Sequence, residues 1–185
     1  MADRVVLMRI GSIAFAVISL LILMNRLVYN SYYDGQGKAQ CQSNLKQMAS
    51  AAYMYAEDWN GYLPPADKWC DSLNKYTSND TQIYTCVNTE TQKFLGIWLR
   101  HKIGRHEWGY AYNSCVAGKQ SESISVPSEQ VVIFDSIAGQ RNRANAITSL
   151  PVTGRHHGGS NVAFADGHVT WCKDGTLPKN EIVKR

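Results

Sequence analysis

The sequence predicts an α+β fold in which one long N-terminal helix packs against an antiparallel β-sheet. An apolar run at residues 10–24 is followed, at residues 38–59, by apolar side chains that recur every three or four positions, as on one face of a helix. Near the C-terminus, the continuous apolar run of residues 131–134 and the alternating pattern of residues 161–165 both indicate β-strands. The apolar face of the helix needs a partner layer, and the strands would supply it.

The N-terminal segment is expected to be a retained membrane helix. The apolar stretch at residues 5–28 is long enough to span a bilayer, since about 20 helical residues suffice. Arg4 and Arg9 favour a cytoplasmic N-terminus. The alternative is a signal peptide that is removed, but no small-residue cleavage pattern occurs at residues 25–29. We therefore expect the rest of the chain outside the cytoplasm, on the cytoplasmic membrane or in an extracellular filament.

The helix expected at residues 38–59 is amphipathic. The side chains on its apolar face are Cys41, Leu45, Met48, Ala52, Tyr55 and Trp59. Residues 34–37 contain two glycines, which are poor helix formers, and they predict a kink or a short break. The chain then divides into an apolar helix at residues 1–33 and a globular head at residues 38–185, which includes the amphipathic helix.

The head continues with short elements. Helical spacing of Trp69, Leu73 and Tyr76 predicts a short helix within residues 67–80, and residues 82–87 predict a short strand. A strand covered on both faces is predicted at residues 130–134, and a long exposed loop at residues 138–154. Two further strands are predicted at residues 161–165 and 168–171. The Asp-Gly pair between the last two strands predicts a type I′ hairpin turn. Exposed loops often carry partner-specific surfaces, so the long loop is a candidate binding surface.

The charge balance is mild and excludes little. The chain has 19 Lys and Arg against 15 Asp and Glu, for a net charge of +4. A nucleic-acid partner is not expected from this charge. Basic residues within residues 94–108 could form a patch for DNA, lipid headgroups or an acidic polymer. A solvated loop is the preferred interpretation, because no aromatic stacking pattern accompanies them.

The cysteines predict covalent cross-links. Five cysteines behind a membrane or export segment, without metal-ligand spacing, suggest an oxidising compartment. The disulfide candidates are Cys41, Cys70, Cys86 and Cys115, and Cys172 is the expected odd residue. Four cysteines admit three pairings, and the sequence does not choose among them.

Three motifs carry a resemblance to a known family. Residues 41–47 read C-x-S-N-L-K-Q, and residues 55–65 read Y-A-x-D-x-N-G-Y-L-P-P. His156 is followed after nine residues by Asp166 and Gly167, which forms an H-x9-D-G signature. Together these motifs resemble bacterial type IV pilin-like and pseudopilin-like proteins, namely the prepilin-type, processing-associated H-x9-DG family.

The resemblance implies a pilin-like fold and a structural role. The expected function is a subunit or minor component of an extracellular pilus-like filament or of a type II secretion-like pseudopilus. The implied partners are other copies of the chain through the N-terminal helix, membrane lipid, and a secretion or pilus assembly machine. In such pilins a Glu follows the cut glycine at the fifth position, but here Gly11 leads to Ala16. This departure favours the alternative, a membrane-anchored module that does not assemble and binds polysaccharide, DNA or another protein.

Histidines and aspartates near the C-terminus suggest a metal site or an acid–base pair. The residues concerned are Asp135, His156, His157, Asp166 and His168. We interpret His156, Asp166 and Gly167 as structural, because Asp-Gly and Gly-Gly pairs form turns. A calcium site at Asp135 and Asp166 and an anchored metallohydrolase are the lesser alternatives. No G-x-S-x-G or C-x-x-C motif occurs, so an enzyme and a cofactor are not expected.

Overall fold

The computed structural model describes most of the chain. The backbone is described for residues 2–90, 93–94, 97–98, 102–106, 108–136, 139–147, 155–156 and 158–173. Within these ranges, the side chains of residues 2–8, 29–31, 33–34 and 87–106 are not described. The predicted basic patch at residues 94–108 therefore lies almost entirely outside the described side chains.

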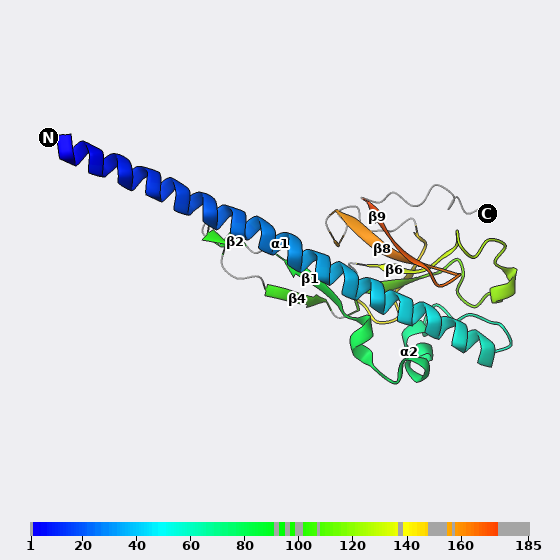
Figure 1. Ribbon diagram of the computed structural model, residues 1–185. Helices are drawn as coiled ribbons and strands as arrows, with labels where there is room; N and C mark the ends of the chain where they lie inside the picture. Colours follow the sequence, from blue (N-terminus) through cyan, green and yellow to red (C-terminus); the bar gives the residue numbers. More distant parts are fainter. Residues whose placement is uncertain are drawn as a thin grey trace.

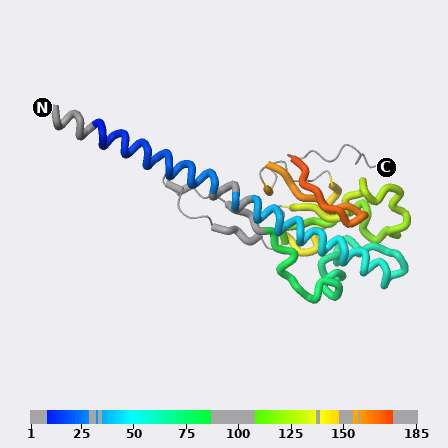
Figure 2. The backbone as a smooth tube through the Cα atoms, in the orientation of Figure 1, coloured from blue at the N-terminus to red at the C-terminus, as the bar shows by residue number. Residues whose placement is uncertain are grey.

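One helix organises the molecule. Helix α1 (Ala2–Asp58) is 57 residues long, or about 85 Å at about 1.5 Å per residue. Its first half projects away from the head and its second half lies along the strands (Figure 1; Figure 2). The helix continues through residues 34–37, so the predicted kink or break is wrong. Each glycine costs a helix only about 1 kcal/mol relative to Ala, and the regular turns on both sides offset that cost.

The head contains a five-stranded sheet in the order β7-β5-β6-β8-β9. The strands are β5 (Tyr110–Asn113), β6 (Val131–Asp135), β7 (Ala144–Asn145), β8 (Gly159–Phe164) and β9 (Val169–Lys173). Neighbouring strands are antiparallel except β7, which runs parallel to β5. The predicted α+β class is confirmed, but the sheet is mixed rather than antiparallel.

The remaining elements are short. They are α2 (Trp69–Leu73), three 3-10 turns η1 (Asn74–Thr77), η2 (Thr81–Tyr84) and η3 (Ser121–Ser123), and the strands β1 (Cys86–Glu90), β2 (Lys93–Phe94), β3 (Ile97–Trp98) and β4 (Lys102–His106). Strand β1 pairs antiparallel with β4, and β2 with β3. The predicted short helix is confirmed. The strand predicted at residues 82–87 begins only at Cys86, because η2 occupies the residues before Thr85.

The described part of the loop predicted at residues 138–154 is only partly exposed, since residues 139–141 and 146 are exposed, residues 142–145 are half-buried and Ile147 is buried. Residues 139–147 supply β7 and also contact α2. The Arg141 guanidinium pairs with the Asp71 carboxylate, and the indole N–H of Trp69 donates to the carbonyl of Arg143 at 3.0 Å. These polar contacts fix the segment to the head, which hydrophobic patterning alone could not predict.

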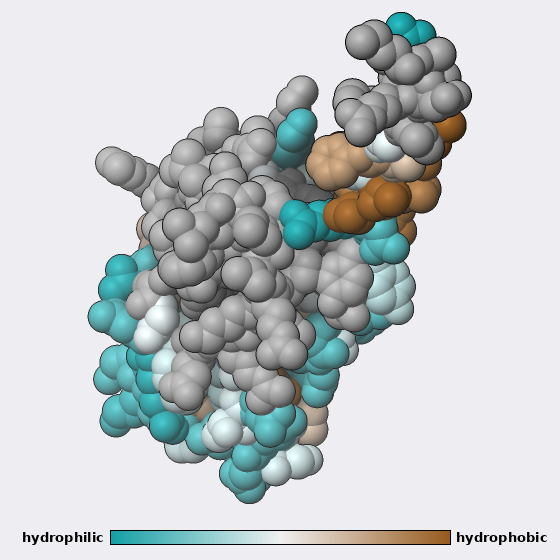
Figure 3. Space-filling model, turned by 90° about the vertical axis from the view of Figure 1, so that its left-hand side faces the viewer, coloured by the Kyte–Doolittle hydropathy of each residue, from teal (hydrophilic) through white to brown (hydrophobic). Residues whose placement is uncertain are grey.

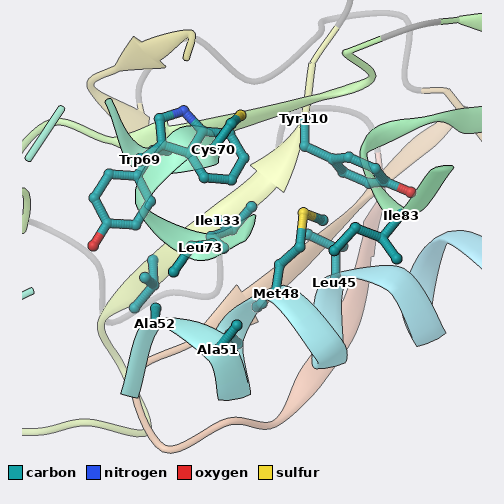
Figure 4. Packing of buried hydrophobic residues seen from close by; sticks show 14 of the residues in the cluster. Leu45, Met48, Ala51, Ala52, Trp69, Cys70, Leu73, Ile83, Tyr110 and Ile133 are labelled. Carbon is teal, nitrogen blue, oxygen red and sulfur yellow. The ribbon is translucent and has the colours of Figure 1, made fainter. Parts of the chain in front are cut away.

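The second half of α1 forms the core with the sheet. Leu45, Met48 and Ala52 are fully buried, and Figure 4 shows them pointing toward side chains of α2 and the sheet. The predicted apolar face is confirmed except at Trp59, which is 57% exposed. Trp59 follows the last residue of α1, and its ring stacks on Tyr55 with centroids 5.3 Å apart.

Strand β6 is covered on both faces, as the continuous apolar run at residues 131–134 predicted. All five residues of β6 are buried. Ile133 belongs to the cluster that packs on α1, whereas Val131 and Phe134 belong to a second cluster. Alternation in β8 divides Ala163 and Val162 in the same way. Strands β6 and β8 therefore sit between two apolar layers.

The β8–β9 hairpin is confirmed, but its predicted turn type is wrong. A type I′ turn needs positive φ at both central residues. Among the described residues of this turn, only Gly167 has positive φ, at 83°. The Gly167 N–H donates to the Phe164 carbonyl at 2.9 Å, and the Phe164 N–H donates to the His168 carbonyl at 2.9 Å. This is the pattern of a three-residue loop in which the last residue is left-handed.

Candidate functional site

Four side chains from distant parts of the sequence meet where α1 contacts β1 and the sheet. We call Cys41, Cys86, Asp135 and His156 the buried cluster, because all four are shielded from solvent. The Sγ atoms of Cys41 and Cys86 lie 2.9 Å apart. Sγ of Cys86 lies 3.4 Å from Nε2 of His156. The same nitrogen lies 3.7 Å from Oδ2 of Asp135.

Helix α1 and strand β1 position the two thiols. Cys41 lies one turn before Leu45 on the face of α1 that packs on the head, and Cys86 is the first residue of β1. Gly109 leaves room for them. A Cβ atom there would lie 2.3 Å from Cβ of Cys86 and 2.8 Å from Nη1 of Arg155. A side chain at this position would therefore push apart the segments that hold Cys86 and Arg155.

Strands β6, β8 and β9 position the other two residues. Asp135 ends β6, and its Oδ2 accepts the backbone N–H of Asn161 at 2.6 Å. His156 forms an antiparallel bridge with Gly159 at the start of β8. Its carbonyl accepts the indole N–H of Trp171, on β9, at 2.9 Å. The hairpin thus holds the backbone of His156 while the imidazole reaches the core.

Burial and close contact perturb the titration of the cluster. Burial raises the pKa of Asp135 to about 7, and the nearby His156 opposes this shift. The hydrogen bond with the Cys86 thiol lowers the pKa of Cys41 to about 5, against the effect of burial. The same contact raises the pKa of Cys86. The two pKa values move in opposite directions because the two thiols contact each other.

Two kinds of chemistry fit this arrangement. Adjacent thiols can be oxidised to a disulfide. Alternatively, Cys41, Cys86 and His156 offer three ligand atoms that lie within 4.8 Å of one another. Thiolate and imidazole are ligands that zinc prefers. Because the cluster is buried, neither arrangement exposes a nucleophile to a substrate.

The structure separates the four disulfide candidates. It brings Cys41 and Cys86 together. Cys70 lies in α2, where burial raises the pKa of its thiol to about 12. Cys115 lies half-buried in the turn after β5. Cys172, the expected odd cysteine, is buried in β9.

The carboxylates of the suggested calcium site lie far apart. Asp135 contacts Asn161 near the start of β8, whereas Asp166 lies beyond the end of that strand. At about 3.3 Å per residue, about 16 Å of strand separates these places. Oδ1 of Asp166 instead accepts the backbone N–H of His168 at 3.0 Å and lies 2.5 Å from Nδ1 of its ring.

The histidines and aspartates suggested as a metal site or an acid–base pair lie in two separate places. His156 and Asp135 lie in the core, and His168 and Asp166 lie in the turn of the hairpin. His157 lies outside the described residues. The link between His156 and the two cysteines is the feature that sequence reasoning missed, because no short spacing joins residues so far apart. The available signals were an aspartate closing a buried strand and a cysteine on the buried helix face.

Comparisons with known proteins give no relative for this chain. No protein-family model, curated protein or solved structure matches it significantly.

Proposed function

We propose that this protein is a pilin-like subunit anchored by its N-terminal helix. In this proposal the projecting half of α1 lies in the cytoplasmic membrane or in the centre of a filament, and the head is presented outside the cytoplasm. The chain would be a structural subunit or minor component of a pilus-like filament or a secretion-linked pseudopilus. One observation carries the proposal, namely an apolar, uncovered helix segment that continues directly into the helix at the core of the head.

The uncovered segment is Arg9–Val28. It is 20 residues long with a mean hydropathy of 2.0, and none of it is buried within the described structure. Phe15 is 74% exposed and Leu21 is 63% exposed. In Figure 3 the hydrophobic residues in view gather on this projecting part, whereas the described surface of the head is mostly hydrophilic. Apolar surface of this extent is expected to contact lipid or other protein.

Length and continuity fit this role. Twenty helical residues at about 1.5 Å each span about 30 Å, the thickness of the hydrocarbon core of a bilayer. Because α1 is unbroken, the head is held at a fixed distance and orientation from the apolar segment. A subunit that packs through its helix and displays its head needs both properties. The H-x9-D-G and helix-end motifs support the same proposal through their resemblance to pilin-like proteins.

A second candidate function has one observation in its favour. The segment Arg9–Val28 contains no Glu, the residue that the pilin resemblance leads one to expect there. The alternative is an anchored module that does not assemble. Its head would bind polysaccharide, DNA or another surface protein.

Crosslinking in cells separates the two functions. A photo-crosslinking amino acid is placed at Leu21, in the projecting part of α1, or at Met54, which is 49% exposed on the part of α1 beside the head. For a filament subunit, Leu21 should give a ladder of crosslinked copies, and material sheared from the cells should contain filaments built from this chain. Met54 is the matched control, because it tests the same helix outside the apolar segment.

The other outcomes are equally specific. Crosslinks from Leu21 to lipid alone, with the intact chain only in the membrane fraction, would favour the anchored module. Mass spectrometry of the mature N-terminus completes the test. A chain that begins after Val28 and is released in soluble form would contradict both functions and identify a removed signal peptide.

A further inference from the structure

We infer that Cys41 and Cys86 form a disulfide that fastens the anchoring helix to the head at the point where the helix enters it. The inference rests on the proposed placement of the head outside the cytoplasm. There the environment oxidises thiols, whereas in the cytoplasm they stay reduced. The sequence left three pairings of four cysteines open, and the contact between these two sulfur atoms selects one of them.

The geometry needs little change for the bond to form. The two Sγ atoms are 2.9 Å apart, and an S–S bond is about 2.05 Å long. Two thiolate ligands of one zinc ion, each about 2.3 Å from it in tetrahedral geometry, would lie about 3.8 Å apart. The contact is therefore already closer than a zinc site would hold the two sulfurs. Both residues are fully buried, which would protect the bond from external reductants.

His156 and Asp135, the other two residues of the buried cluster, can have a structural role next to a disulfide. Nε2 of His156 faces the Asp135 carboxylate at 3.7 Å, and the Asn161 N–H binds the same carboxylate oxygen. These contacts tie the end of β6 to the start of β8 without requiring a metal ion. The cluster then acts as a fastening that joins α1, β1, β6 and β8.

The oxidation proceeds by thiol–disulfide exchange. The Cys41 thiolate attacks the disulfide of an exported thiol oxidase, or of a small-molecule disulfide, and forms a mixed disulfide while one thiol of the oxidant leaves. The Cys86 sulfur, after losing its proton, attacks Cys41 in this mixed disulfide and releases the second thiol. Two protein thiols are thus oxidised and one disulfide of the oxidant is reduced. Because the site closes on folding, the exchange belongs to a stage before α1 is fully packed.

The position of the bond gives it a mechanical role. Among the residues of α1 whose side chains are described, Gly37 and Cys41 are the first buried ones after the projecting part. A pull on the anchor therefore reaches Cys41 before it reaches Leu45 and Met48 in the core. A bond at Cys41 passes the load to β1 and prevents α1 from peeling off the sheet.

Mass spectrometry of the full-length protein tests the bond. Cells are treated with N-ethylmaleimide before lysis, and the denatured protein is digested with trypsin without reduction. The expected result is a linked peptide pair, residues 39–46 with residues 76–93, and labelling of at most three of the five thiols. The Cys115→Ser variant should keep the linked pair, and the Cys41→Ser variant should lose it.

Two further measurements on the same cells make the outcome decisive. Protease added outside, after removal of the cell wall or outer membrane, reports whether the head is exposed. Exposed heads with all five thiols labelled would overturn the disulfide and leave its placement intact, whereas protected heads would overturn the proposed placement itself. Stoichiometric zinc in the purified protein, with Cys41 and Cys86 both reduced, would overturn the disulfide in favour of a metal site.

Discussion

Asp135 shows how strongly a single buried residue depends on its surroundings. It is fully buried, and among the described residues its Oδ1 has no hydrogen-bond partner. An ionised carboxylate in such a place is costly, which is why burial raises its pKa to about 7. The unfolded chain has an aspartate pKa of about 3.9. The folded state therefore binds more protons than the unfolded state between these two values.

The Asp135→Asn variant tests this linkage. Because the folded pKa is raised, the wild type loses stability as pH rises from about 4 to about 7, by up to about 4 kcal/mol. The Asn variant lacks this titration. Its unfolding free energy should therefore rise relative to that of the wild type between about pH 4 and about pH 7, and the difference should stay constant above that range. Urea unfolding at several pH values measures it. Asp58→Asn is the control, because Lys75 lowers the pKa of Asp58 and its effect should change only below about pH 4. Equal differences at pH 5 and pH 8 would contradict the prediction.

Gly109 is a second residue whose requirement comes from its neighbours. An added Cβ would overlap Cβ of Cys86 at 2.3 Å. We expect Gly109→Ala to lower the unfolding free energy by about 1–3 kcal/mol through overpacking. Gly35→Ala is the matched control, because an added Cβ meets nothing within 4 Å among the described residues, and Ala is the better helix former. Thermal unfolding should show a lower midpoint for the first variant and an unchanged or higher one for the second.

At the scale of elements, α1 is one helix in two environments. Its first half presents apolar side chains outward, as a helix in lipid or in a bundle does. Its second half buries one face and leaves residues such as Lys46 and Met54 exposed. The two halves therefore make different contacts, and substitutions in the two halves should change the unfolding free energy of the head by different amounts.

The packed half should depend on its buried face. Leu45→Ala removes a fully buried side chain from the contact between α1 and the sheet, and it should cost about 2–5 kcal/mol of unfolding free energy. Met54→Ala, on the exposed side of the same helix, should cost less than about 0.5 kcal/mol. Denaturant unfolding in detergent compares the two variants. Similar losses for both would show that the head does not pack on this face of α1.

The continuity of α1 through its two central glycines can be measured as a distance. Spin labels carried by non-natural amino acids at Ser19 and Lys46 lie on either side of residues 34–37. An unbroken helix places these positions about 40 Å apart. Pulsed electron–electron double resonance should give a narrow distribution of distances between the two labels, centred near that value. A broad distribution or a clearly shorter distance would restore the joint that the glycines predicted.

Across the whole molecule, a load on the projecting part of α1 passes to the head through the contacts of the second half of this helix. Hydrophobic packing holds α1 along the core face together with a few hydrogen bonds, such as those from the Asn44 amide to the Thr85 carbonyl and the Tyr110 hydroxyl. Contacts of this kind yield one turn at a time when the helix is peeled from one end. A bond between residues 45 positions apart would also remove about 4 kcal/mol of chain entropy from the unfolded state. The disulfide would therefore increase both the unfolding free energy and the resistance of the head to force.

Single-molecule pulling measures this effect. Handles at positions 19 and 173 load α1 from its projecting end. With the disulfide intact, the chain between the cysteines, 45 residue steps long, cannot extend, so full unfolding should release about 160 Å less chain, at about 3.5 Å per residue. Reductant should restore that length in the wild type. The Cys41→Ser/Cys86→Ser variant should give the longer value under both conditions, and a wild type that ignores reductant would contradict the bond.

The features that depend on local periodicity could be predicted from the amino-acid sequence. These are the apolar helix segment, the buried face from Cys41 to Tyr55, the doubly covered strand β6 and the β8–β9 hairpin, because spacing along the chain fixes which side chains share a face. The residues of the turn predicted its position but not its type. The Asp-Gly pair located the hairpin, but the contacts of Phe164 and His168 selected a different turn.

The other features depend on contacts between residues that are far apart in the sequence. The meeting of Cys41, Cys86, Asp135 and His156 joins residues from α1, β1, β6 and the bridge before β8, and no local pattern records which distant residues will touch. The parallel strand β7 also depends on contacts with α2 and β5 rather than on its own two residues. In residues 34–37, the local preference for a break was overruled, because helix formation is cooperative and the turns on both sides favour continuation.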